Sequence, residues 1–145
     1  MKRLVYVLLI ASFTCMADQK SAEKLAVETY NHLVSYEGRL DAAIRSGDKD
    51  KFYRFVVNPM MDIRSRWPVP FEGDEYRKFA RCYYALDSFR LYSEERFKAG
   101  GHLSESNVTA RDYFNQKALC KKSINGKTAI RKIVWNDEFD GARHH

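Results

Sequence analysis

Residues 73–101, GDEYRKFARCYYALDSFRLYSEERFKAGG, form the most strongly patterned stretch of the 145-residue chain. Their apolar side chains recur every three or four residues, which is typical of the buried face of an α-helix. Gly73 and Asp74 provide a start signal, and residues 99–101 provide a stop. The pattern therefore predicts one helix over residues 75–98 at the centre of the fold. Its inward positions are Phe79, Cys82, Tyr83, Leu86, Phe89 and Phe97, flanked by Tyr76, Tyr84, Leu91 and Tyr92.

A helical hairpin is predicted at the start of the folded domain. Apolar residues recur at helical intervals over residues 21–44, although Gly38 lowers the helix propensity and allows a bend near residues 36–39. Gly47 then ends this helix, and Asp48 offers a side-chain cap for the next one.

The second helix of the hairpin is predicted over residues 49–57. It should end before Pro59, because the residue that precedes a proline avoids helical backbone angles. A short third helix is predicted over residues 60–66, followed by residues 67–70, WPVP, which must be extended or turned. The side chains expected on the inner face of the second helix are Phe52, Phe55 and Val56.

The C-terminal part of the chain predicts one more helix and then an extended tail. Residues 104–106 offer caps for a helix that reaches about Lys122, with inward positions at Val108, Tyr113, Phe114, Leu119 and Cys120. Residues 128–135, TAIRKIVW, favour a strand, but a lone strand has no partner, so a packed extended tail fits equally well. We therefore predict an all-α domain over residues 18–124, a small bundle of about four to five helices, with an extended segment and tail over 125–145.

The first seventeen residues have the composition of a secretory signal. A basic pair precedes an apolar run of about ten residues, which is too short to cross a membrane, and Ala17 suits a cleavage site. We expect residues 1–17 to be removed and the remainder to reside in the periplasm. Lipid attachment at Cys15 is the alternative, although the residues before it depart from the usual lipoprotein motif. No second long apolar run follows, so no membrane span is predicted.

The two remaining cysteines predict a disulfide. Removal of the signal would leave Cys82 and Cys120, an even number in an oxidising compartment. Closing so long a loop stabilises the fold by on the order of 4 kcal/mol. Two isolated cysteines without a nearby histidine do not form a zinc motif. We expect the bond to join two helices of the bundle.

No motif for catalysis or metal binding is visible. The four histidines include no pair at the four-residue spacing of a helical zinc site. Residues 136–141, NDEFDG, resemble half of an EF-hand loop, but the chain ends before the required glutamate at position 12. Adjacent carboxylates such as Glu94 and Glu95 point in different directions, whereas acid–base catalysis needs carboxylates that face one cleft. We therefore predict no enzyme activity, no metal site and no cofactor.

Aromatic and basic side chains offer a candidate partner-binding surface. Residues Trp67 to Phe71, WPVPF, form an apolar loop stiffened by proline, and such loops suit interfaces because little entropy remains to be lost. Arg77, Lys78 and Arg81 would add positive charge that attracts an acidic protein. Export makes nucleic acid an unsuitable partner. The competing interpretation, which we favour because large aromatic side chains are commonly buried, is that Trp67 and Phe71 are core residues that fasten the loop to the central helix.

The combined profile suggests a protein that binds another protein. A signal segment, a small helical domain, one disulfide and no catalytic motif are similar to the small periplasmic binding and inhibitor proteins of bacteria. Among these, immunity proteins that block a secreted antibacterial effector resemble the chain in size and helical content, without a shared motif. The first expectation is therefore an immunity-type inhibitor. The alternatives are an accessory protein for envelope assembly or secretion, and a carrier of a small ligand or metal.

Overall fold

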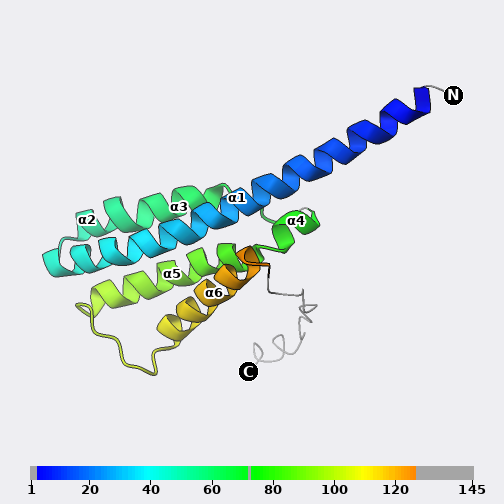
Figure 1. The fold of residues 1–145 in the computed structure, drawn as a ribbon. Helices are drawn as coiled ribbons and strands as arrows, with labels where there is room; N and C mark the ends of the chain where they lie inside the picture. The colour runs from blue at the N-terminus through cyan, green and yellow to red at the C-terminus, as the bar shows by residue number, and fades with distance from the viewer. Residues whose placement is uncertain (1–2, 72, 127–145) are drawn as a thin grey trace, which may run out of the picture.

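The protein is a bundle of helices, as the sequence predicts. The computed structural model describes residues 3–71 and 73–126, with side chains from residue 20 onward. No strand occurs within these ranges. Figure 1 shows α1 running along the bundle, with α2 and α3 on one side and α5 and α6 on the other. The elements in chain order are α1 (Arg3–Ser46), α2 (Lys49–Phe52), the π-helical turn η1 (Tyr53–Val57), α3 (Asn58–Ser65), α4 (Asp74–Arg77), α5 (Ala80–Lys98) and α6 (Val108–Ile124).

Helix α1 is one unbroken helix, and its N-terminal part extends well beyond the other helices (Figure 1). The bend that Gly38 allows does not occur, because a continuous buried stripe, including Leu33, Tyr36 and Leu40, holds this stretch against the bundle. The helix ends as predicted: Gly47 has a φ of 63°, and the Asp48 side chain accepts the Lys51 N–H at the start of α2. No helix in the described ranges is long and apolar enough to cross a membrane.

The prediction that the second helix ends before Pro59 is wrong. Helical structure runs without interruption from α2 through η1 into α3, and Pro59 lies in the first turn of α3. A proline ring normally clashes with the carbonyl four residues earlier and removes a hydrogen-bond donor. Here the π turn widens the backbone, and the Asn58 N–H donates to the carbonyl of Tyr53, five residues back. The wider turn accommodates the proline inside a continuous helix.

The π turn also changes which side chains face inward. A regular helix would place Phe52, Phe55 and Val56 on one face. The wider turn instead directs Phe52, Val56 and Val57 into the core and leaves the Phe55 side chain 48% exposed. The prediction that Phe55 is a core residue is therefore wrong.

The long helix predicted over residues 75–98 is divided in two. Helix α4 ends at Arg77 and α5 begins at Ala80. Across the break the backbone hydrogen bonds span three residues instead of four, as where the Phe79 N–H donates to the Tyr76 carbonyl. Phe79 leaves the helical conformation, and its side chain is fully buried. No glycine or proline marks this break in the sequence. Burial of Phe79 accounts for it, because a core contact can outweigh local helix propensity.

Helix α5 is the central element, packed against α1, α3 and α6. The predicted stripe is confirmed at Phe79, Cys82, Tyr83, Leu86 and Phe89, all of which are buried. Three positions on α5 and α6 differ from the prediction. Leu91 on α5 is 45% exposed, and on α6 Phe114 is 50% exposed while Tyr113 is buried. Val108, also predicted to face inward, is exposed as well.

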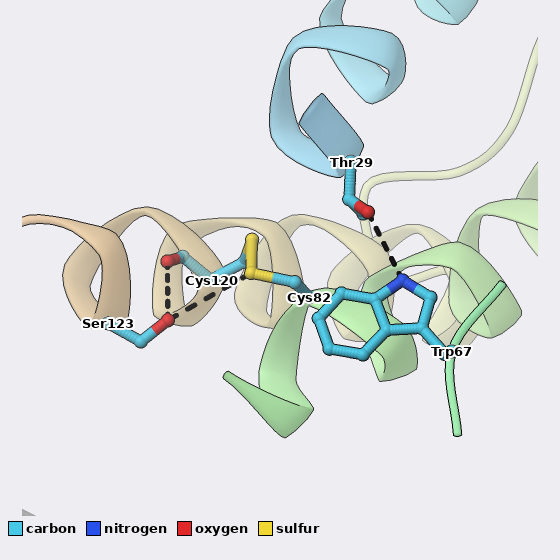
Figure 2. Close-up of a disulfide and its surroundings, with 5 residues drawn as sticks. All are labelled: Thr29, Trp67, Cys82, Cys120 and Ser123. Carbon is cyan, nitrogen blue, oxygen red and sulfur yellow. Dashed lines mark hydrogen bonds between the residues drawn. A yellow bond between two sulfur atoms is a disulfide. The ribbon is translucent and has the colours of Figure 1, made fainter. Parts of the chain in front are cut away.

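The disulfide between α5 and α6 is confirmed. Cys82 and Cys120 are bonded with a Cα–Cα distance of 4.5 Å, and both residues are fully buried (Figure 2). The Ser123 hydroxyl donates to the Cys120 carbonyl at 2.7 Å and lies 3.9 Å from the Cys82 sulfur. The bond therefore sits inside the α5–α6 contact rather than at its surface.

A pair of leucines on α5 tests the assignment of its inner face. Leu86→Ala should lower the free energy of unfolding by about 2–5 kcal/mol, because Leu86 is fully buried and its loss leaves a cavity. Leu91→Ala makes the same chemical change at an exposed position and should cost less than about 0.5 kcal/mol. Urea unfolding followed by circular dichroism measures both values. Equal losses for the two variants would mean that the helix faces are assigned incorrectly.

Candidate functional site

Trp67, a candidate anchor for a partner, is a core residue, as the favoured interpretation expects. Its side chain is only 4% exposed, and its indole N–H donates to the Thr29 hydroxyl at 3.2 Å (Figure 2). Thr29 lies on α1 and is itself fully buried. Trp67 thus joins the end of α3 to α1. A side chain with so little exposed surface cannot anchor a partner while the loop stays folded, so the candidate interface must be sought elsewhere.

Phe71 is half-buried and belongs to the same packed region. It makes edge-to-face contacts with Trp67 and Tyr83 at centroid distances of 6.3 and 5.5 Å, and with Tyr84 at 6.2 Å. Such aromatic pairs stabilise beyond the area they bury. Tyr76 also packs on Trp67. The arrangement corresponds to the competing interpretation, in which the loop is fastened to the central helix.

The three basic residues predicted beside this loop do not converge on a common hollow. Arg77 donates to the Phe71 carbonyl and lies 3.6 Å from Asp74, while Arg81 donates to Gln116 on α6. Lys78 is exposed, with its ammonium 5.2 Å from the centroid of the Phe79 ring. Each of the three interacts within the fold, and no joint site results.

Shifted pKa values point to structural bonds between helices. The hydrogen bonds from the Arg66 guanidinium hold the pKa of the Glu28 carboxyl below its usual value, and this pair ties the end of α3 to α1. Burial raises the pKa of the Tyr113 hydroxyl far above its usual value, and the bond to Glu37 adds to the effect. Glu37 accepts both this hydroxyl and the Lys117 ammonium at 2.7 Å, which joins α1 to α6.

A wide groove runs between α1, α5, α6 and the loop that joins α5 to α6. Its volume is about 770 Å³, and the half-exposed Phe114 contributes to its wall. Arg96 spans the groove: Nη1 lies 2.7 Å from Asp41 Oδ1, and Nε donates to the Gly101 carbonyl. Glu37, Glu105 and Arg111 also line it, so carboxylates and guanidinium groups are mixed throughout.

A second surface lies on the other side of α1 and contains a hollow whose charged lining residues are all positive. The π turn presents Tyr53, Arg54 and Phe55 to solvent as three consecutive exposed side chains. Beside them a hollow of about 390 Å³ separates α1 from the π turn. Its lining is Arg39, Ala42, Ala43, Ser46, Lys51 and Phe55. We call Arg39, Lys49, Lys51, Tyr53, Arg54 and Phe55 together the π-turn surface.

Sequence reasoning missed the π-turn surface because it assigned Phe55 to the core. A sequence signal does exist, since Pro59 follows a segment with helical pattern and would strain a regular turn before it. π turns of this kind occur frequently at functional sites. The combination of a proline with five aromatic or β-branched residues in KFYRFVVNP marks the place where the inward face of the helix could change.

The described side chains include no group of three or more His, Cys, Asp or Glu residues arranged to hold a metal ion. His32, on α1, lies 3.8 Å from Glu28. Two predictions from the sequence concern residues outside the described ranges, namely the strand or tail over 128–135 and the segment 136–141.

The chain matches no protein-family model, no curated protein and no solved structure. No relative therefore suggests a function. The proposals below rest on the contacts, exposure and charge of the described residues.

Proposed function

We propose that this chain is an exported periplasmic protein-binding module, most specifically an immunity-type inhibitor of a secreted antibacterial effector. The observation that carries the proposal is the π-turn surface, where two half-exposed aromatic side chains flank Arg54. Tyrosine and arginine are enriched among residues that contribute most to protein–protein binding, and buried aromatic anchors are typical of interface centres.

Two features support export. The first seventeen residues have the pattern of a secretory signal, and the N-terminal part of α1 extends beyond the bundle rather than packing between helices (Figure 1). The buried disulfide is the kind of bond that forms and persists in an oxidising compartment. Lipid attachment through Cys15 remains the alternative form of the exported chain.

Inhibition would occur by covering the partner's active cleft with a surface that is already ordered. The Asp48 cap fixes the start of α2, and the π turn is held by backbone hydrogen bonds. An ordered surface loses little conformational entropy on binding, so more of its contact energy appears as affinity. The full chain carries a formal net charge of +6, and 6 − 2 = +4 remains after loss of Lys2 and Arg3 with the signal, which would draw an acidic partner toward it.

The groove between α1, α5 and α6 supports a second candidate function, a carrier of a small ligand. Its volume of about 770 Å³ is within the usual range for ligand sites. Its walls, however, mix opposite charges that already pair with one another, as Arg96 does with Asp41. The accessory-protein alternative uses the same π-turn surface and differs in the identity of the partner.

Capture from the native periplasm tests the proposal. The full chain should retain one exported protein in stoichiometric amount and abolish that protein's enzymatic activity. Phe55→Ala should weaken the complex by about 2 kcal/mol, or roughly 30-fold in Kd, because a half-exposed aromatic anchor is lost. Phe114→Ala is the matched control, since Phe114 is exposed to the same degree but lines the other groove, and it should change Kd by less than about threefold.

Three outcomes would contradict the proposal. Hydrolytic turnover by the pure chain would indicate an enzyme. A captured protein that keeps full activity would favour the accessory role. Loss of binding with Phe114→Ala alone would place the interface in the groove.

The intact mass of the protein recovered from the periplasm should show that residues 1–17 are absent. A diacylglyceryl adduct would instead locate a lipid at Cys15.

A further inference from the structure

We infer that the hollow beside the π turn receives an acidic segment of the partner protein, one that carries an apolar side chain between carboxylates. This inference rests on the proposed function and specifies the chemistry of the partner at the same site. The hollow lies between α1 and the π turn, and we call Ala42 and Ala43, its apolar lining on α1, the floor. The half-exposed Phe55 ring forms one wall.

The shape of the hollow suits a protruding side chain. Its volume of about 390 Å³ is at the lower end of the range for ligand sites. The small side chains of Ala42 and Ala43 leave the floor apolar and open, and Phe55 offers an aromatic face to a guest. An apolar side chain that enters the hollow would remove half of the Phe55 ring from water, which is favourable in proportion to the area covered.

The charges that surround the floor are positive. Arg39 on α1 and Lys51 on α2 line the hollow, and no carboxylate does. Within the described ranges Arg39 makes no ion pair, and its guanidinium lies 5.3 Å from the centroid of the Tyr36 ring. Arg54, in the π turn, is exposed and likewise unpaired within those ranges. Carboxylates on either side of the guest side chain would meet these cations.

Two acidic residues at the rim restrict the kind of anion that fits. The Asp48 carboxylate lies 3.7 Å from the Lys51 ammonium and also caps α2, and Asp50 is exposed two residues further along the chain. A polyanion with evenly spaced charges would be repelled at these positions. A protein segment avoids the repulsion, because its carboxylates can be placed opposite Arg39 and Arg54 while an apolar residue fills the hollow.

The groove on the other side of α1 does not have the same preference for an acidic segment. Phe114 resembles Phe55 in exposure, but the residues around it include Glu37, Asp41 and Glu105. Arg96 and Arg111 lie among these carboxylates, so the charges have no single sign and an acidic segment would gain less there. The two surfaces therefore provide an internal comparison within one chain.

The test uses the oxidised, 15N-labelled full chain and a synthetic peptide of sequence Gly-Asp-Glu-Phe-Asp-Glu-Gly as the probe. Titration should shift the backbone amide signals of Arg39, Ala43, Lys51 and Phe55. Arg39→Glu should weaken peptide binding at least about tenfold, because a cation that faces the carboxylates becomes an anion. Raising the salt concentration should weaken binding as well, since the charges are exposed and therefore screened.

Matched controls distinguish binding at the hollow from a general effect of the protein's net charge on peptide affinity. Arg111→Glu changes the net charge by the same amount on the α6 side of the groove and should alter the affinity by less than about twofold. A peptide with alanine in place of phenylalanine should bind at least about fivefold more weakly, because nothing fills the hollow. A peptide with Asn and Gln in place of Asp and Glu should not bind.

Several results would overturn the inference. These are no shifts at the four amides with millimolar peptide, equal binding of the neutral peptide, an equal loss with Arg111→Glu, or equal shifts with phosphatidylglycerol vesicles. Failure of this inference can be told apart from failure of the proposed function. Capture and inhibition of a partner without peptide shifts would reject the acidic segment alone, whereas peptide shifts without any captured inhibitor target would reject the immunity role alone.

Discussion

Replacing Trp67 with alanine should lower the free energy of unfolding by about 3–5 kcal/mol, the range for loss of a large buried aromatic side chain. Trp67 is 4% exposed, packs against Phe71, Tyr76 and Tyr83, and donates its indole N–H to Thr29. Its removal would leave a cavity at the junction of α1, α3 and α5 and would strand the buried Thr29 hydroxyl. Urea unfolding followed by circular dichroism at low temperature measures the change.

Trp67→Phe separates the cavity from the hydrogen bond. This variant keeps an aromatic ring in the core but removes the donor to Thr29, so it should cost less than alanine, about 1–3 kcal/mol. A loss below about 1 kcal/mol for Trp67→Ala, accompanied by weaker partner binding, would show that Trp67 lies in the interface after all. Full destabilisation with partner affinity unchanged in the folded fraction is the expected result.

Removal of the disulfide should cost about 4 kcal/mol of stability. The bond links Cys82 and Cys120 across a sequence separation of 38 residues, and its main effect is to restrict the unfolded chain. A double Cys82→Ala, Cys120→Ala variant keeps small apolar side chains at both buried positions. Because domains of this size have total stabilities of about 5–15 kcal/mol, the variant should be close to unfolded at elevated temperature.

Comparison of the oxidised and reduced wild-type chain is the control for this variant. Both forms retain the sulfur atoms, so their difference reports the covalent link without the loss of side-chain volume. The reduced chain should lose nearly as much stability as the double variant. Two freely alkylatable thiols in unreduced protein, or a loss below about 1 kcal/mol, would contradict the structural role of the bond.

The order of the helices and their ends could be read from local sequence where a strong signal was present. Gly47 and Asp48 form the turn between α1 and α2 as expected, with Gly47 at positive φ and Asp48 as the cap. Such cap and turn signals depend on a few neighbouring residues, so they can be recognised without knowledge of the tertiary contacts. The pairing of Cys82 with Cys120 also followed from counting cysteines, because removal of Cys15 with the proposed signal would leave no other combination.

The candidate binding site could not be read in the same way. The sequence pointed to Trp67 and Phe71, which lie together but in or beside the core. The π-turn surface appeared instead at Phe55, a residue with the correct spacing for burial next to Phe52. Periodicity assumes regular helix geometry, and the turn before Pro59 departs from it.

Local pattern was sufficient for the all-α class, the hairpin turn and the central stripe of α5, because helix periodicity and caps arise within one or two turns of chain. The exposure of individual aromatic residues depended on distant segments. Tyr113 is buried because α1 and α5 cover it, and Phe114, its neighbour on α6, is half-exposed at the edge of the α5–α6 contact, where its ring meets Tyr92. The buried residue is the more polar of the two, so hydrophobicity does not explain the difference, which arises from the packing of helices that are far apart in the sequence.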